Sequence, residues 1–177
     1  PAYWSGRAYN LFPIVGRLTE GKYTYKNKTY EMNLHGFVRK SELKVVNRTI
    51  DSVVFEKTED ENTLSMYPFR FTYRVGYRLT GNRLSTCYEV INTGDELLIF
   101  SVGGHPGFNV PLGKDERFED YYLEFDCVKP AKSIIMSHTC YITDKTADFP
   151  MKDGKIIELK HDLFDNDAIV LQDMCKK

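Results

Sequence analysis

The chain has 177 residues, a length that fits one domain with a hydrophobic core of ordinary size. Its 24 Lys and Arg residues balance 25 Asp and Glu residues, so its charge gives no reason to expect nucleic acid or an anionic membrane as partner. The longest uninterrupted apolar run, Leu97 to Phe100, is too short to span a bilayer. These properties predict a soluble protein. They are compatible with a small neutral molecule as ligand.

The four cysteines are widely spaced and include no Cys-x-x-Cys pair. A chain of this size folds without disulfide bonds, so we expect reduced thiols and a cytoplasmic location. The N-terminus lacks the basic and long apolar segments of a secretory signal. It also lacks an initiator Met, which suggests that an upstream segment is missing.

The aromatic residues alternate with polar residues at a period close to two, which favours strands over helices. Residues 22–32 read as a hairpin around a Lys-Asn-Lys turn, and residues 42–59 read as a second hairpin with a break at 47–51. Asp60 or Asn62 can cap one or two helical turns before Pro68. The clearest pattern follows at residues 71–90, a long antiparallel hairpin around Gly81-Asn82.

Further short strands are expected at residues 96–104, 120–127, 137–144, 155–160 and 168–173, and a single helical turn at 160–167. Many strands separated by turn residues indicate an antiparallel sandwich or barrel. No repeat, linker or low-complexity segment marks a boundary, so we predict one domain over residues 1–177.

Two of the four histidines stand in unusual local contexts. His35 lies in "MNLHGF" after the first hairpin, and His105 lies in "SVGGHPGFN" after an apolar run. Glycine neighbours keep the approach to each imidazole open, and imidazole can donate or accept a proton near neutral pH. Each is either a structural group at a strand end or part of a ligand site, whereas His138 and His161 are expected to be surface groups.

Other site chemistries find little support in the sequence. No two histidines have the short spacing of metal ligands, so no metal site is expected. There is no Gly-x-Gly-x-x-Gly motif or Walker lysine for a nucleotide, and no cysteine stands in a context that lowers a thiol pKa. Three arginines near His35 in sequence, Arg7, Arg17 and Arg39, could instead bind sugar hydroxyls or a phosphate, although each could also be a solvated charge.

The residues "GRAYNLFPIVGRLTEGKYTYKNKTYEMNLHGF" and "YPFRFTYRVGYRLTGNRLSTCYEVINTGDELLIFSVGGHPGFNVPL" are similar in order to the aldose 1-epimerase (mutarotase) family. The likeness is to its bacterial aldose 1-epimerase-like branch, and "GRLTEGKY", "LHGF" and "GGHPGFN" together carry it. It implies an all-β, antiparallel β-sandwich of the galactose mutarotase-like type. It also implies interconversion of the α and β anomers of an aldohexose, with no cofactor and no metal.

Site residues follow from the resemblance position by position. His105 resembles the general acid that protonates the ring oxygen, and His35 resembles the second histidine, which hydrogen-bonds the sugar. Arg17 resembles the substrate-binding arginine, and Arg7 and Asn109 are further candidates for sugar binding. The glycines beside His105 are expected to leave room for the sugar.

The family's catalytic base is a glutamate on a late strand, and no matching motif occurs in this sequence. We therefore expect a chain truncated at both ends, with an incomplete sandwich. Asp165 or Asp167 could supply an acidic group to the cleft. Two alternatives stay open: a non-catalytic carbohydrate-binding protein on the same fold, and a hexose-6-phosphate mutarotase in which Arg7, Arg17 and Arg39 converge.

Overall fold

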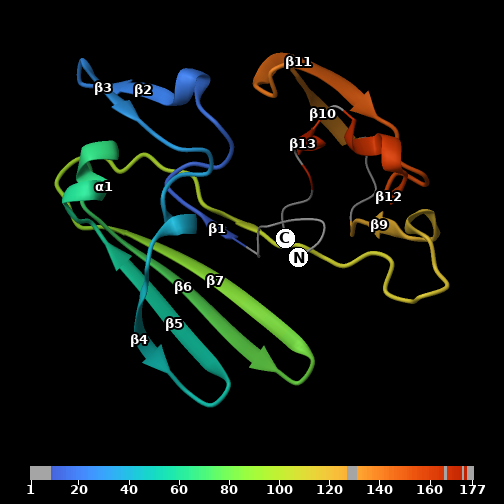
Figure 1. The fold of residues 1–177 in the computed structure, drawn as a ribbon, viewed down its shortest axis with the longest axis horizontal. Coiled ribbons are helices and arrows are strands. Elements are labelled where there is room, and N and C mark those ends of the chain that lie inside the picture. The colour runs from blue at the N-terminus through green and yellow to red at the C-terminus, as the bar shows by residue number, and fades with distance from the viewer. Residues whose placement is uncertain (1–8, 127–130, 166, 173, 175–177) are drawn as a thin grey trace. The chain divides into compact units, whose positions relative to one another are not determined.

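The computed structural model describes residues 9–126, 131–165, 167–172 and 174. Two compact units divide the chain, residues 1–107 and residues 108–177. Both consist of short antiparallel strands and turns, with a single short α-helix among the described residues (Figure 1). The predicted all-β class is therefore confirmed. No helix in the described part of the chain is long and apolar enough to cross a bilayer.

The first unit carries the following elements in chain order: β1 (Tyr9–Leu11), η1 (Thr19–Gly21), β2 (Lys22–Tyr25), β3 (Lys28–Glu31), η2 (Val38–Lys40), β4 (Lys44–Arg48), β5 (Ser52–Thr58), α1 (Glu61–Met66), β6 (Phe71–Thr80), β7 (Arg83–Asn92) and β8 (Gly103–His105). Its main sheet has the strand order β4-β5-β6-β7, and β2 pairs with β3 in the first predicted hairpin. The short turns η1 and η2 are 3-10 helices.

The predicted long hairpin is formed by β6 and β7, which pair from Phe71↔Asn92 to Thr80↔Arg83. On β6 the side chains of Phe71, Tyr73 and Val75 are buried, and the residues between them are partly exposed. Successive side chains of a strand point to opposite faces, so this alternation directs one face of the sheet into the core.

Phe12 lies at the centre of that core and is fully buried. Its ring contacts the rings of Phe71 and Tyr73, each at a centroid distance of 5.1 Å, and those of Phe37 and Tyr67 at about 6 Å. Aromatic pairs in such tilted and edge-on arrangements add to the stabilisation from burial. The core thus fixes the segment after β1 against the segment after β3 and against β6.

The structure corrects the strand predicted at residues 96–104. Only Gly103–His105 forms a strand, β8, and it pairs with β1, which the sequence pattern did not predict. Residues 97–102, which precede β8, pair with no strand in the described structure. Within this segment, Ser101 donates its backbone N–H to the carbonyl of Pro13 at 2.8 Å. An apolar run becomes a strand only where a neighbouring strand completes its hydrogen bonds.

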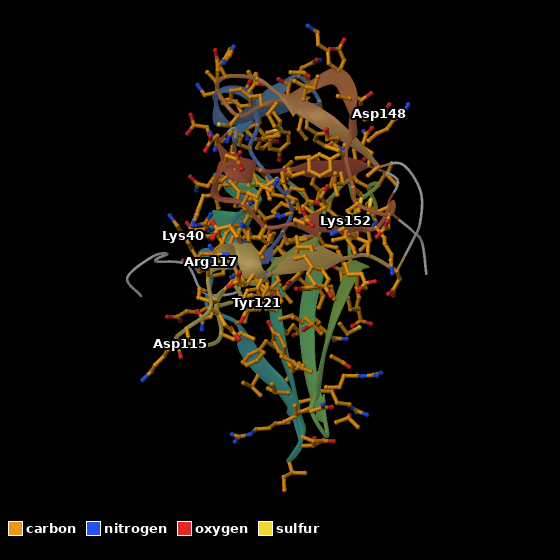
Figure 2. The ribbon with its side chains drawn as sticks, turned by 90° about the vertical axis from the view of Figure 1, so that its right-hand side faces the viewer. Lys40, Asp115, Arg117, Tyr121, Asp148 and Lys152 are labelled. Atoms are coloured by element: carbon orange, nitrogen blue, oxygen red, sulfur yellow. The ribbon has the colours of Figure 1, made fainter. Side chains whose placement is uncertain are left out.

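The second unit contains β9 (Tyr122–Glu124), β10 (Ala131–Met136), β11 (Ile142–Phe149), β12 (Ile156–Glu158) and β13 (Val170–Gln172), with the turns η3 (Phe118–Asp120) and η4 (His161–Phe164). β9 pairs with β12, and β10 lies between β11 and β13. β10 was not predicted, and β11 begins later than expected because residues 137–141 form a turn closed by Ser137 and Tyr141. Figure 2 marks Arg117 and Tyr121, which flank η3.

Candidate functional site

His35 is held in an unusual backbone conformation by the turn after β3. Its φ angle is 63° and that of Gly36 is 72°, both in the left-handed region. The next two N–H groups, of Phe37 and Val38, donate to the carbonyl of Phe12 at 3.1 and 3.3 Å. A Cβ at Gly36 would lie 2.1 Å from that carbonyl oxygen, so the turn requires glycine. The core residue Phe12 therefore positions the histidine.

Two hydrogen bonds to Gly16 orient the imidazole and backbone of His35. The Gly16 N–H donates to Nδ1 of His35 at 3.0 Å, and the His35 N–H donates to the Gly16 carbonyl at 2.8 Å. An Nδ1 that accepts a hydrogen bond leaves the ring proton on Nε2. Burial lowers the pKa of His35 from its usual 6.5, and the neighbouring His105, Arg39 and Arg17 lower it further. His35 is therefore a neutral imidazole with an Nε2–H donor.

The ring of His105 lies against that of His35, although the two are 70 residues apart in sequence. Their centroids are 5.4 Å apart, and the ring planes meet at 73°. His105 ends β8 and is the Cα partner of Tyr9 on β1. The short β1–β8 ribbon therefore brings the two predicted histidines together, and a proton donor and a hydrogen-bond donor can act on one small molecule there.

Arg17 and Arg39 flank this histidine pair. Arg17 directly follows Gly16, and Arg39 lies in η2, where its guanidinium stacks over the ring of Tyr9 at 4.6 Å. Within residues 9–126 and the other described segments, neither arginine forms an ion pair with a carboxylate. The Nε of Arg39 is buried and has no hydrogen-bond partner among the described groups. The site is thus electropositive.

The remaining predicted residues lie outside the described residues of the first unit. Arg7 lies outside the described residues. Asn109 is exposed and belongs to the second unit, where its role stays a prediction. Asp165 and Asp167 line a hollow of about 710 Å³ in the second unit, together with the exposed His138.

The sequence pattern did not predict that the ring of Tyr9 packs against the guanidinium group of Arg39. β1 is only three residues long, so no alternation could reveal it. Its pairing with β8 is also a long-range contact that local patterns do not encode. That the glycines beside His105 leave room for the sugar stays a prediction, and the structure adds that a Cβ on Gly104 would meet the hydroxyl of Tyr88. Gly104 therefore makes room for Tyr88.

The described residues show no cluster of metal-ligating side chains. They contain no group of three or more His, Cys, Asp or Glu side chains arranged to hold an ion. Cys87 is exposed, and Cys140 is partly exposed in the second unit. The described side chains at the histidine pair are the two imidazoles and the guanidinium groups of Arg17 and Arg39.

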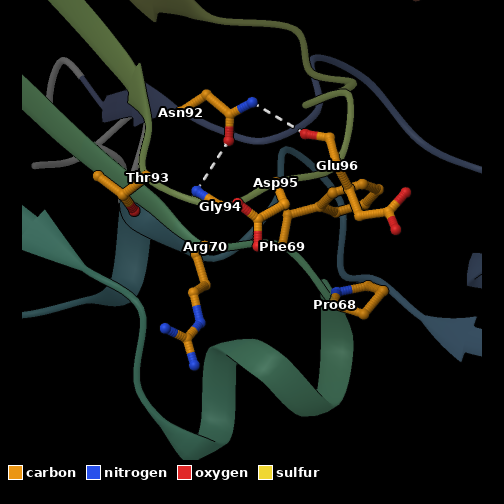
Figure 3. Close-up of a pocket in the computed structure, with 8 residues that line it drawn as sticks. All are labelled: Pro68, Phe69, Arg70, Asn92, Thr93, Gly94, Asp95 and Glu96. Carbon is orange, nitrogen blue, oxygen red and sulfur yellow. Dashed lines mark hydrogen bonds between the residues drawn. The ribbon is translucent and has the colours of Figure 1, made fainter.

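A separate hollow of about 400 Å³ lies on the first unit, lined by residues 68–70 and 92–96 (Figure 3). Asn92 dominates its polar contacts, since its Nδ2 donates to the Glu96 carbonyl at 2.8 Å and its Oδ1 accepts from Gly94 N–H at 3.1 Å. These bonds close the loop itself. The hollow contains no histidine, and we place the candidate site at His35 and His105.

Residues 2–171 match the family described as aldose 1-epimerase. The chain belongs to the aldose 1-epimerase family. Protein LacX of Lactococcus lactis subsp. lactis, in its plasmid and chromosomal forms, is 34% identical to this family member over 180 residues. The alignment covers 97% of the chain and 60% of LacX. This family member thus spans less than two thirds of the length of its curated relatives.

Solved structures show the same relationship for this aldose 1-epimerase family chain. A galactose mutarotase related enzyme from Lactobacillus acidophilus is 39% identical, with a TM-score of 0.87 over 93% of this chain and 54% of that one. A galactose mutarotase-like protein from Lactobacillus casei is 32% identical, with a TM-score of 0.88 over 96% of this chain and 58% of that one. The predicted galactose mutarotase-like β-sandwich is confirmed by these similarities.

Proposed function

We propose that this protein interconverts the α and β anomers of an aldohexose by acid–base opening of the pyranose ring. The observation that carries the proposal is the convergence of His35 and His105, whose ring centroids are 5.4 Å apart. Membership of the aldose 1-epimerase family supports this reaction class. The proposed chemistry needs proton transfers only, for which side chains suffice.

In the proposed mechanism, His105 donates a proton to the ring oxygen while a base removes the proton of the C1 hydroxyl. The bond between C1 and the ring oxygen then breaks and leaves an open-chain aldehyde. Rotation about the C1–C2 bond and reclosure on the other face produce the opposite anomer, with both protons returned. His105 is thus the proposed catalytic acid.

His35 has a different proposed role because it is held neutral. Its Nε2–H donates a hydrogen bond to the ring or anomeric oxygen, and the Gly16 N–H on Nδ1 keeps the ring proton on Nε2. Arg17, one residue from that contact, is proposed to bind sugar hydroxyls with its fork of N–H donors. The base is proposed to be the late glutamate that the family resemblance implies, supplied from outside the residues described.

Polarimetry on fresh α-glucose and α-galactose with the complete protein tests this proposal. We expect mutarotation faster than the spontaneous rate, and a loss of about 100-fold or more in kcat for His105→Ala, as for removal of a general acid. His138→Ala, a change at an exposed histidine of the second unit, is the matched control and should retain activity. Mutarotation at the spontaneous rate with every sugar would contradict the proposal.

A non-catalytic sugar-binding protein on the same fold gives a different result in the same experiment. Calorimetry would then detect sugar binding that weakens in His35→Asn, while the rotation of fresh sugar would relax no faster than in buffer. The two outcomes distinguish binding from catalysis, because only catalysis needs the acid and base in addition to the hydrogen-bond donors.

A hexose 6-phosphate is a second candidate substrate, and a specific observation favours it. Arg17 and Arg39 both lie close enough to lower the pKa of His35, and neither has a carboxylate partner among the described residues. Guanidinium groups bind phosphate through paired hydrogen bonds. No acceptor among the described groups competes for the buried Nε of Arg39.

Arg39→Gln separates the two substrates. If the phosphate is bound there, kcat/KM for glucose 6-phosphate or galactose 6-phosphate should fall by about 10- to 100-fold, the loss expected for a charge-assisted hydrogen bond. The same change should leave kcat/KM for the unphosphorylated sugars nearly unaltered. Arg48→Gln, on the exposed strand β4, is the control. Equal effects on both sugar classes would exclude a phosphate-specific role for Arg39.

A further inference from the structure

The ribbon of β1 and β8 has two faces with different chemistry. Tyr9 pairs with His105, and Asn10 pairs with Gly104. Neighbouring residues of a strand point to opposite sides, so Asn10 and Gly104 share the face opposite to that of Tyr9 and His105. One face of the ribbon thus carries His105, the proposed acid, and the opposite face carries Asn10 and Gly104.

A small hydrogen-bond network lies on the second face. The side chain of Asn10 donates from Nδ2 to the Tyr77 hydroxyl at 2.8 Å, and its Oδ1 accepts from the Tyr88 hydroxyl at 3.0 Å. Tyr77 is on β6 and Tyr88 on β7, so one amide joins the ribbon to two strands of the main sheet. Burial, with a smaller effect from Tyr77, raises the pKa of the Tyr88 hydroxyl, which therefore stays protonated as a donor.

Gly104 packs directly on the same tyrosine. A Cβ built on Gly104 would lie 2.7 Å from the Tyr88 hydroxyl oxygen, and the next nearest atom, Cζ of that ring, would be 3.7 Å away. The backbone of Gly104 is not in the left-handed region, so a side chain there is opposed by the Tyr88 oxygen alone. The hydroxyl of Tyr88 thus occupies the space that a Cβ on Gly104 would need.

We propose that Asn10 and Tyr88 are positioning residues that fix β8 on the main sheet and thereby set the place of the His105 imidazole relative to His35. Neither residue acts on the sugar; both act through the adjacent Gly104 and the paired strand. The consequence for catalysis rests on the mutarotase function proposed above. The hydrogen bonds of Asn10 and the close contact of Gly104 with Tyr88 hold β8 in place whether or not the protein is an enzyme.

A double-mutant cycle in the complete protein tests the proposal. Gly104→Ala should push β8 away from the sheet and lower kcat by about 10- to 100-fold with little change in KM, as expected when a proton donor is displaced by a fraction of an ångström to 1 Å. Tyr88→Phe alone should cost only a few-fold. In the combined variant the added methyl meets no hydroxyl, so kcat should return to within a few-fold of that of Tyr88→Phe.

Gly103→Ala is the matched control on the same strand. Its Cβ would lie 3.4 Å from a methyl of Val15, a contact that a side chain can accommodate, so kcat should be close to that of the wild type. Thermal melting of all variants shows whether each is folded. A purely structural role would lower stability without the rescue of kcat by Tyr88→Phe.

NMR of the histidine imidazoles separates this proposal from the proposed function. The His105 resonances should shift in Gly104→Ala and return toward their wild-type positions in the double variant, whether or not the protein accelerates mutarotation. If the wild type is inactive but this pattern holds, the proposed function fails and the positioning role stands. Additive effects in the cycle, or His105 shifts equal to those in Gly103→Ala, would overturn the positioning role.

Discussion

The conformation, tautomer and pKa of His35 are set by contacts with residues that are distant in sequence. Its left-handed backbone is made possible by the turn, and Gly16 fixes its tautomer. Burial and the charges of His105, Arg39 and Arg17 all lower its pKa. An imidazole that stays neutral keeps an Nε2–H donor, as the role proposed for His35 requires.

The lowered pKa of His35 predicts how stability depends on pH. The unfolded chain, with a pKa near 6.5, binds more protons than the native state between that value and the lower native pKa, so stability should fall as the pH decreases through this window. His35→Asn, which tolerates the left-handed backbone, should flatten this part of the dependence. Thermal melting from pH 5 to 7.5 measures this pH dependence of stability, with His138→Asn as the control. A pH dependence in His35→Asn equal to that of the wild type would contradict a lowered pKa of His35.

At the scale of elements, the site is built by short segments anchored on the core. The turn at Gly36 joins β3 to η2. It is held in place by the carbonyl of Phe12, which accepts hydrogen bonds from the N–H groups of Phe37 and Val38. The β1–β8 ribbon is anchored from the other side by Asn10. Loops that carry functional residues are commonly fixed in this way to a rigid scaffold.

Gly36→Ala should disrupt the turn severely. The left-handed backbone costs roughly 1 to 2 kcal/mol for alanine, and the clash with the Phe12 carbonyl adds about 1 to 3 kcal/mol. Gly81→Ala is the matched control, since Gly81 also has a positive φ, 58°, but its Cβ would meet nothing within 4 Å. Denaturant unfolding should show the larger loss at Gly36, and equal losses at both sites would contradict the proposed close packing.

The cap of α1 offers a prediction that separates two candidates left open by the sequence. The Asp60 carboxylate accepts from the Thr63 N–H at 2.8 Å, and the Thr63 hydroxyl accepts from the Asp60 N–H at 2.8 Å. Asp60→Ala should therefore destabilise the protein by about 1 kcal/mol, whereas Asn62→Ala should have little effect. Chemical denaturation measures both, and a larger loss for Asn62→Ala would refute the observed capping box.

Among the described residues, large apolar side chains are exposed on the segment that follows the last strand of the main sheet. β7 is the last strand of the main sheet, and the segment after it exposes Leu97, Ile99 and Phe100 at 78%, 60% and 42%. Strand edges and contiguous apolar surface favour association. Relatives of known sequence and structure are longer than this chain, which covers 54% to 60% of them.

We therefore predict that the 177-residue chain expressed alone binds the dye ANS and associates as its concentration rises. The double change Leu97→Lys and Ile99→Lys should reduce both effects. Ile50→Lys, at a fully exposed isolated position, should reduce neither. Fluorescence measures the dye binding, and sedimentation velocity measures the association. A monomer that binds no dye would contradict the exposure of Leu97, Ile99 and Phe100.

The strand-rich class and the hairpins at residues 22–32 and 71–90 could be predicted from the sequence, because alternation and turn residues are local signals. The sequence also singled out His35 and His105 as candidate site residues. It did not reveal β1 or β10, and of the strand that it predicted at 96–104, residues 96–102 have no partner strand in the described structure. The contacts of His35 with His105, of Arg39 with Tyr9 and of Gly104 with Tyr88 could be seen only in the folded chain. These contacts join segments far apart in sequence, and the pairing of such segments depends on the core around Phe12 and not on local preference.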